Sequence, residues 1–239
     1  MPRGTGQLAA FLRRGPPVSG LPPRLAGMSA PVSTPEDLRI VVDAVMAGFA
    51  QVPDDGWTRA AHGLTWDCRD TAAHLIDDFA AYAMNLSGRE VYVDGYTPFV
   101  DPPQWQPTTP PNLVWPDPAK GTAAIVRCVD AAGGLLVAVT ATAPPGHVGY
   151  HGCGNADASG FAAMGIVEGA AHAWDVLTAH DLEFRIDGDL CHRVLNRLFP
   201  GATRTDDGWH DFLAATHRTE DNREGHWRWD STVRATYGD

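Results

Sequence analysis

Residues 161–175, FAAMGIVEGAAHAWD, restrict the fold of this chain more than any other segment. A helix through them gathers Glu168, His172 and Asp175 on one line of an otherwise apolar surface. Burying a carboxylate costs several kcal/mol unless it is paired or holds a cation. The segment therefore predicts a helix within a mainly α-helical protein, in which Glu168 binds either a metal ion or a buried cationic side chain.

Glu168 and His172 have a spacing that suits metal binding. Cβ atoms four residues apart on a helix lie about 5–6 Å from each other, so both side chains point the same way. A third candidate, His74, lies in a second helical segment, off its bulky apolar stripe. Two histidines and one glutamate form a ligand set that zinc enzymes use with one coordination position open. We predict His74, Glu168 and His172 as metal ligands, and Asp175 as the group that orients the His172 ring.

Each of these residues also has a plainer interpretation. Glu-x-x-x-His pairs are common on solvated helix faces, a single histidine near a helix start is often exposed, and Asp175 fits a surface acid equally well. The ligand set does not select one metal, because nickel and iron accept imidazole and carboxylate ligands as zinc does. We expect a divalent metal ion, Zn²⁺ first, with Ni²⁺ and Fe²⁺ as alternatives.

Helical patterns recur along the chain and predict a four-helix bundle with a short helical C-terminal extension. Thr34 as a cap and Pro35 at the first helical position mark the first helix start. The expected long helices cover residues 35–51, 70–86, 118 onward and 159–179, and shorter ones follow at 189–199 and 209–216. If the third helix ends at its Gly-Gly pair, residues 135–142 form a strand instead.

This pattern divides the chain into three parts. Residues 1–32 are expected to be a disordered leader, in which Met28 is an alternative start. The bundle occupies residues 33–181, and the small extension occupies residues 182–239.

The amino-acid composition argues against several classes of binding partner. The formal net charge of −11 and the single lysine, Lys120, argue against nucleic acid or an anionic membrane as a partner. Four widely spaced cysteines without a Cys-x-x-Cys pair indicate neither a disulfide framework nor a thiolate zinc site, and fit a reducing cytoplasm. No apolar run approaches the roughly 20 residues that span a bilayer. We expect a cytoplasmic monomer or homodimer that acts on a small molecule.

Two loops contain further candidates for functional residues. The connection at residues 88–116 is long and rich in proline and aromatic residues, which indicates a lid or pocket wall. His147 and His151, in the Gly-rich loop before the last long helix, are candidates for acid–base catalysis, with solvent exposure as the alternative. Cys153, two residues after His151, suggests a Cys/His nucleophile, but its glycine neighbours indicate a turn.

The segments WDCRDTAAHL at 66–75 and GIVEGAAHAWD at 165–175 together resemble the DinB/YfiT-like metalloprotein superfamily. Within it, they are most similar to the mycothiol-dependent maleylpyruvate isomerase N-terminal domain group of actinobacteria. The resemblance covers residues 35–180 and depends on the order His…Glu-x-x-x-His-x-x-Asp. It implies a four-helix bundle that carries a divalent metal, typically zinc, on His74, Glu168 and His172.

The resemblance also implies a chemistry, in which the metal binds the sulfur of a low-molecular-weight thiol such as mycothiol. A cation stabilises thiolate over thiol and so provides a nucleophile at neutral pH. The expected activity is S-transfer to a small electrophile or its thiol-dependent isomerisation. A metal-dependent hydrolase that uses activated water and a non-catalytic bundle that binds a metal or small ligand are the alternatives. No arginine in residues 185–234 matches a substrate-handling motif.

Overall fold

The computed structural model describes residues 32–90, 92–99, 110, 112–219 and 227–237. Within these ranges the chain is mainly helical, as predicted. The described elements are α1 Pro35–Phe49, the short 3-10 helix η1 Gly56–Thr58, α2 Cys68–Ser87, the 3-10 helix η2 Pro118–Lys120, α3 Gly121–Thr142, strands β1 Val148–Gly149 and β2 Ala156–Asp157, α4 Ala158–Thr178, α5 Gly188–Leu198 and α6 Gly208–Ala215. Apart from residue 32, the expected leader, with Met28, lies outside the described residues.

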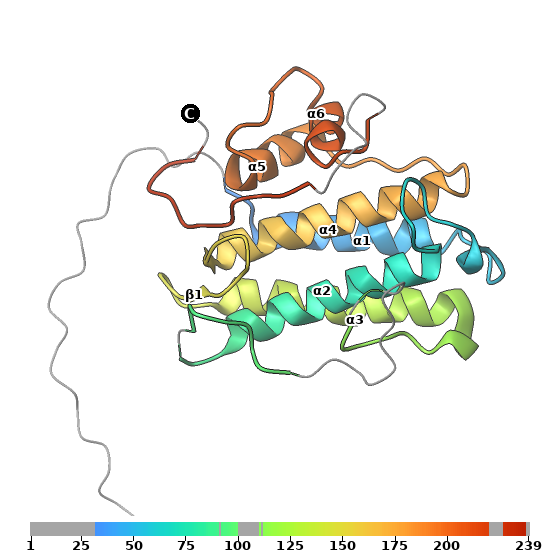
Figure 1. The fold of residues 1–239 in the computed structure, drawn as a ribbon, viewed down its shortest axis with the longest axis horizontal. Helices are drawn as coiled ribbons and strands as arrows, with labels where there is room; N and C mark the ends of the chain where they lie inside the picture. The colour runs from blue at the N-terminus through green and yellow to red at the C-terminus, as the bar shows by residue number, and fades with distance from the viewer. Residues whose placement is uncertain (1–31, 91, 100–109, 111, 220–226, 238–239) are drawn as a thin grey trace, which may run out of the picture.

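The four long helices lie side by side (Figure 1). α1 packs against α3 and α4, and α2 packs against the same two helices, so α1 and α2 occupy opposite corners. In the connection between them, the buried Trp57 packs on Phe49 with ring centroids 5.4 Å apart, and its Nε1–H donates to Thr122 Oγ1 at 2.8 Å. This arrangement places α2 beside α4, the two helices that carry the predicted ligands.

Side-chain caps begin the helices close to their predicted starts. The Asp37 N–H donates to Thr34 Oγ1, and the Thr34 N–H donates to the Asp37 carboxylate, which together form a capping box at the start of α1. Asp67 and Asp157 each accept from a backbone N–H three residues later, at the starts of α2 and α4. Each such cap stabilises its helix by about 1 kcal/mol.

α3 continues through Thr142, so the alternative of a strand at residues 135–142 was wrong. Gly133 lets α3 approach α1 closely, because an added Cβ would lie 2.7 and 2.8 Å from the methyl carbons of Val42. This packing outweighs the weak helix propensity of glycine. The helical segment Pro118–Thr142 contains an 18-residue window of mean hydropathy 1.7, so by length and composition it could cross a membrane. This differs from the expectation that no apolar run approaches membrane-spanning length.

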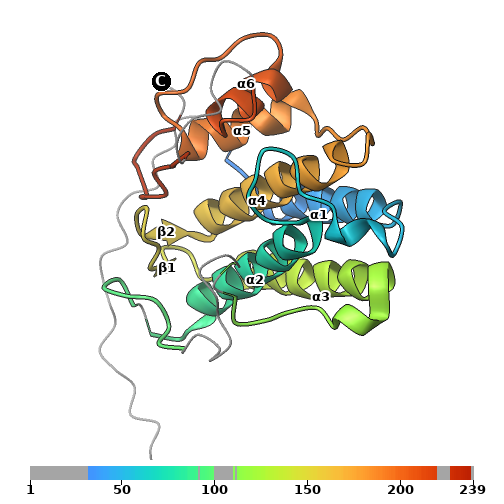
Figure 2. The same ribbon diagram turned by 45° about the vertical axis from the view of Figure 1, so that its right-hand side comes forward.

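α5 and α6 are the two shorter helices expected after the long ones; they pack against each other, and α5 packs on α4 (Figure 2). The fully buried Arg197 ties the extension to the start of α4, since it donates to Asp157 Oδ1 at 3.3 Å and to the Ser231 carbonyl at 2.9 Å. Trp227 and Trp229 are partly buried against the core. The last described residues are therefore packed on α5 and on the loop that precedes α4.

Candidate metal centre

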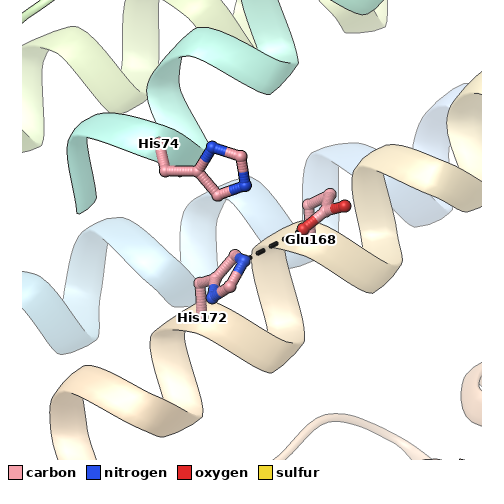
Figure 3. Close-up of side chains that lie close together, drawn as sticks. All are labelled: His74, Glu168 and His172. Atoms are coloured by element: carbon pink, nitrogen blue, oxygen red, sulfur yellow. Dashed lines mark ion pairs between the residues drawn. The ribbon is translucent and has the colours of Figure 1, made fainter. Parts of the chain in front are cut away.

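α2 and α4 run in opposite directions and bring the predicted ligands together. The donor atoms of His74, Glu168 and His172 all lie within 4.8 Å of one another (Figure 3). The two histidine rings are 5.3 Å apart between centroids, and His172 Nε2 lies 3.1 Å from Glu168 Oε2. These three side chains form a group able to hold a metal ion.

The surroundings of Glu168 are suited to binding a cation. Its side chain is 7% exposed, and Oε2 has no hydrogen-bond partner among the described residues. A buried carboxylate oxygen without a partner carries a free-energy cost that a coordinated cation removes. Burial acts to raise the pKa of Glu168, but the contact with His172 and the charges of His172, His74 and Arg218 hold that pKa below its usual value. Glu168 is therefore an anion at neutral pH.

The two histidines differ in protonation. Burial, followed by the charge of His172, lowers the pKa of His74 to about 4, so this ring is neutral at pH 7. Burial also disfavours a charge on His172, but the hydrogen bond with Asp175, the close contact with Glu168 and the charges of both carboxylates outweigh it and raise the pKa of His172. A metal ion would displace the proton on His172 Nε2, because a ligating imidazole must offer a lone pair.

Asp175 lies where it can orient His172, with Oδ2 3.0 Å from Nδ1. It is 1% exposed, so the alternative of a surface acid was wrong. Arg218, beyond α6, holds Asp175 in turn: its Nε–H donates to Oδ1 at 2.9 Å and an Nη2–H donates to Oδ2 at 2.6 Å. The guanidinium carbon lies 5.3 Å from the centroid of the Trp227 ring. This buried chain of contacts fixes the ring so that Nε2 faces Glu168.

Tyr82 holds the other oxygen of the glutamate. Its hydroxyl donates to Glu168 Oε1 at 3.3 Å in the interior, which leaves Oε2 beside His172. Burial is the main reason that the pKa of Tyr82 lies well above its usual value, so the hydroxyl keeps its proton. The sequence pattern places Tyr82 in the apolar stripe of α2. The one signal of its second role is that a buried tyrosine hydroxyl usually needs a polar partner.

The Gly-rich loop brings His151 to the edge of the cluster. His151 is buried, so the alternative of a solvent-exposed side chain was wrong for this residue. Its ring lies 5.6 Å from that of Tyr82 and stacks on Trp229 at 5.5 Å. Burial lowers the pKa of His151, and its Nδ1 accepts the Cys153 N–H at 3.1 Å. The neutral ring therefore carries its proton on Nε2.

The other two loop candidates are placed differently. His147 Nε2 lies 3.0 Å from the Leu86 carbonyl oxygen, near the end of α2 and about 18 Å along that helix from His74. The structure therefore does not bring His147 to the ligands. Burial raises the pKa of the Cys153 thiol, which disfavours the thiolate that a nucleophile needs.

The open side of the cluster is at His74. The side chain of His74 is 24% exposed, against 6 to 7% for the two ligands on α4. The buried Asn112, at the end of the long connection before α3, lies near the His74 ring. The backbone N–H groups of the next two residues, Leu113 and Val114, each donate to Asp77 Oδ1 at 2.9 Å. This end of the connection therefore borders the site. Residues 100–109 lie outside the described part of the chain.

Comparisons with family models, with curated proteins and with solved structures gave no match to this chain. The interpretation of the site depends on its own residues. Two of these, Tyr82 and Arg218, were not predicted. Arg218 follows Asp175 by 43 positions, and no sequence pattern links the two.

Proposed function

We propose that this chain is a DinB-like, divalent-metal-dependent protein that activates a low-molecular-weight thiol for attack on a small electrophile. The observation that carries metal binding is the buried Glu168 Oε2, which lacks a hydrogen bond of good geometry and lies beside two imidazoles. A divalent cation held there would favour thiolate over thiol at neutral pH. Zinc suits two histidines and one carboxylate, and nickel and iron accept the same donors.

In this proposal the surrounding residues orient the ligands and carry one proton. Arg218 and Asp175 hold the His172 ring, and the Tyr82 hydroxyl holds Glu168. His151 has Nε2–H available beside Tyr82 and donates this proton to the electrophile as the sulfur adds. Of the two loop histidines predicted for acid–base catalysis, the proposal keeps His151 alone.

The protonation of His151 favours thiol addition over hydrolysis. A hydrolase that uses water needs a base to accept the proton of that water. The neutral ring of His151 has its free lone pair on Nδ1, and this atom already accepts the Cys153 N–H. A thiol is far more acidic than water and releases its proton to the solvent as it binds in the thiolate form, so the addition step itself requires only the proton donor that the tautomer provides. The choice of mycothiol itself comes from the sequence resemblance at residues 66–75 and 165–175.

The test is turnover with and without each component. Protein loaded with Zn²⁺ is mixed with mycothiol and either maleylpyruvate or a panel of small electrophiles, and S-conjugates and isomers are followed by mass spectrometry. We expect turnover that requires both metal and thiol, is lost in His172→Ala, and is kept in the surface variant Arg39→Met. Turnover without thiol would support the hydrolase instead. If there is no turnover and mycothiol does not change the absorption spectrum of the Co²⁺-loaded protein, the proposal is wrong.

A further inference from the structure

Asp78 is a second carboxylate beside the candidate ligands, and its Oδ2 atom is buried. It lies on α2, one helical turn after His74, and its side chain is 16% exposed. Oδ2 is 3.2 Å from His74 Nε2, yet it has no hydrogen-bond partner among the described residues. The two atoms are therefore close without being aligned as donor and acceptor.

The same relationship occurs on the facing helix. Glu168 Oε2 is 3.1 Å from His172 Nε2, and this oxygen too lacks a hydrogen-bond partner within the described chain. Neighbouring ligands around a tetrahedral ion with bonds of about 2.0–2.1 Å lie about 3.3 Å from each other. Both distances are close to the separation of neighbouring donors around one ion.

Asp78 lies close enough to Glu168 and Asp77 for their negative charges to repel its own. Arg218, a nearby buried cation, already makes a two-point contact with Asp175. Two facing acids in such surroundings are stabilised by a cation between them.

We propose that Asp78 is a fourth protein donor to the divalent cation held by His74, Glu168 and His172. This inference rests on the metal binding proposed above and deepens it, since it defines a donor set of two nitrogens and two carboxylates. The group of atoms within 4.8 Å does not include Asp78, which adjoins that group at His74, so binding requires the carboxylate to turn toward α4. Catalytic zinc sites can expand to five ligands, so Asp78 and the thiol sulfur could bind the same ion together with the three other donors.

The test compares variants of Asp78 that separate ligation from charge. Asp78→Asn removes the charge, whereas Asp78→Glu keeps the charge but moves the oxygens. Asp43→Asn is the control, because it makes the same charge change on an exposed side chain of α1. Zn²⁺ affinity is measured by competition with a chelating indicator, coordination by the visible spectrum of the Co²⁺-loaded protein, and folding by thermal unfolding of the metal-free protein.

If Asp78 is a donor, both Asp78 variants bind Zn²⁺ at least about 100-fold more weakly, which is the upper end of what loss of an outer hydrogen-bond partner costs. Both also change the Co²⁺ spectrum, while the metal-free Asp78→Asn protein unfolds at no lower temperature than the wild type. The control binds as the wild type does.

Three results would overturn the inference. Unchanged affinity in Asp78→Asn would exclude a direct donor. Weaker binding in Asp78→Asn with normal affinity and an unchanged Co²⁺ spectrum in Asp78→Glu would reduce the role of Asp78 to its charge. In both cases the metal centre itself would stand. A wild-type protein that binds no metal would instead refute the proposed function together with this inference.

Discussion

The contact between Arg218 and Asp175 gives the most direct test of how the C-terminal part supports the site. Arg218→Met keeps most of the side-chain volume and removes the guanidinium. The variant loses two charge-assisted hydrogen bonds, at 2.9 and 2.6 Å, and leaves Asp175 as a buried charge beside His172. Removal of one partner of a buried ion pair costs about 3–5 kcal/mol. For a chain of this size that cost lowers the unfolding temperature by about 10 °C.

The assay is thermal and urea unfolding followed by circular dichroism. Arg39→Met is the matched control, because Arg39 lies 3.6 and 3.7 Å from the exposed acids Asp43 and Asp130. Such surface pairs contribute less than about 1 kcal/mol. We also expect Arg218→Met to weaken Zn²⁺ binding about 10- to 100-fold, since it frees the group that orients a ligand.

A double-mutant cycle tests whether the loss of stability in Arg218→Met comes from the charge of Asp175. In an Asp175→Asn background the charge that Arg218 neutralises is absent, so the additional loss caused by Arg218→Met should fall to about 1–2 kcal/mol. The reasoning would be refuted if Arg218→Met costs no more than the control, or if its cost is the same with and without the Asp175 charge.

The remaining predictions concern the ligands and the helix packing. Tyr82→Phe removes the hydroxyl that donates to Glu168. Zn²⁺ binding, measured by chelator competition, should become about 10-fold weaker, and the free energy of unfolding should fall by about 1 kcal/mol. An unchanged Zn²⁺ affinity would contradict this role of Tyr82. The pKa of His172 is raised above its usual value of 6.5, so below that raised pKa Zn²⁺ must displace a proton to bind. The Zn²⁺ affinity should therefore rise about tenfold per pH unit up to the pKa of His172 and level off above it, and calorimetry below that pKa should show one proton released per ion. In the metal-free protein the same shift stabilises the fold below pH 6.5, and this contribution is lost as the pH rises through the raised pKa. Gly133→Ala should destabilise the protein by about 1–3 kcal/mol, because the new Cβ would lie 2.7 and 2.8 Å from valine methyl groups of α1. In Gly134→Ala the new Cβ would meet only the flexible end of Arg39, at 3.2 Å, so this variant should stabilise the protein by up to about 1 kcal/mol. Equal melting temperatures for the two variants would contradict this reasoning.

The helices were predictable where local chemistry decides them. The capping box at Thr34 and the cap at Asp157 involve residues only three positions apart, so their signals are complete within a short segment. The end of α3 was not predictable in this way. Gly133 lowers helix propensity, and the reason that the helix continues is its contact with Val42 on another helix.

The same distinction applies to the site. Glu168, His172 and Asp175 share one helix, so their common line could be predicted from helical geometry alone. The contact of His74 with His172 joins two helices, and the sequence resemblance was needed to connect them. Arg218 reaches Asp175 from the C-terminal segment through long-range packing, for which the chain carries no periodic signal.

The central claim, that this cluster binds a divalent metal ion, is tested most directly by metal analysis. Wild-type protein and His172→Ala are purified without a metal-binding tag, reconstituted with Zn²⁺, passed through a desalting column and analysed by mass spectrometry. Removal of a ligand from a three- or four-donor site should abolish tight binding. We predict about one equivalent of zinc per wild-type chain and none in the variant. A wild-type protein that retains no metal after reconstitution, or a variant that retains as much as the wild type, would contradict the account.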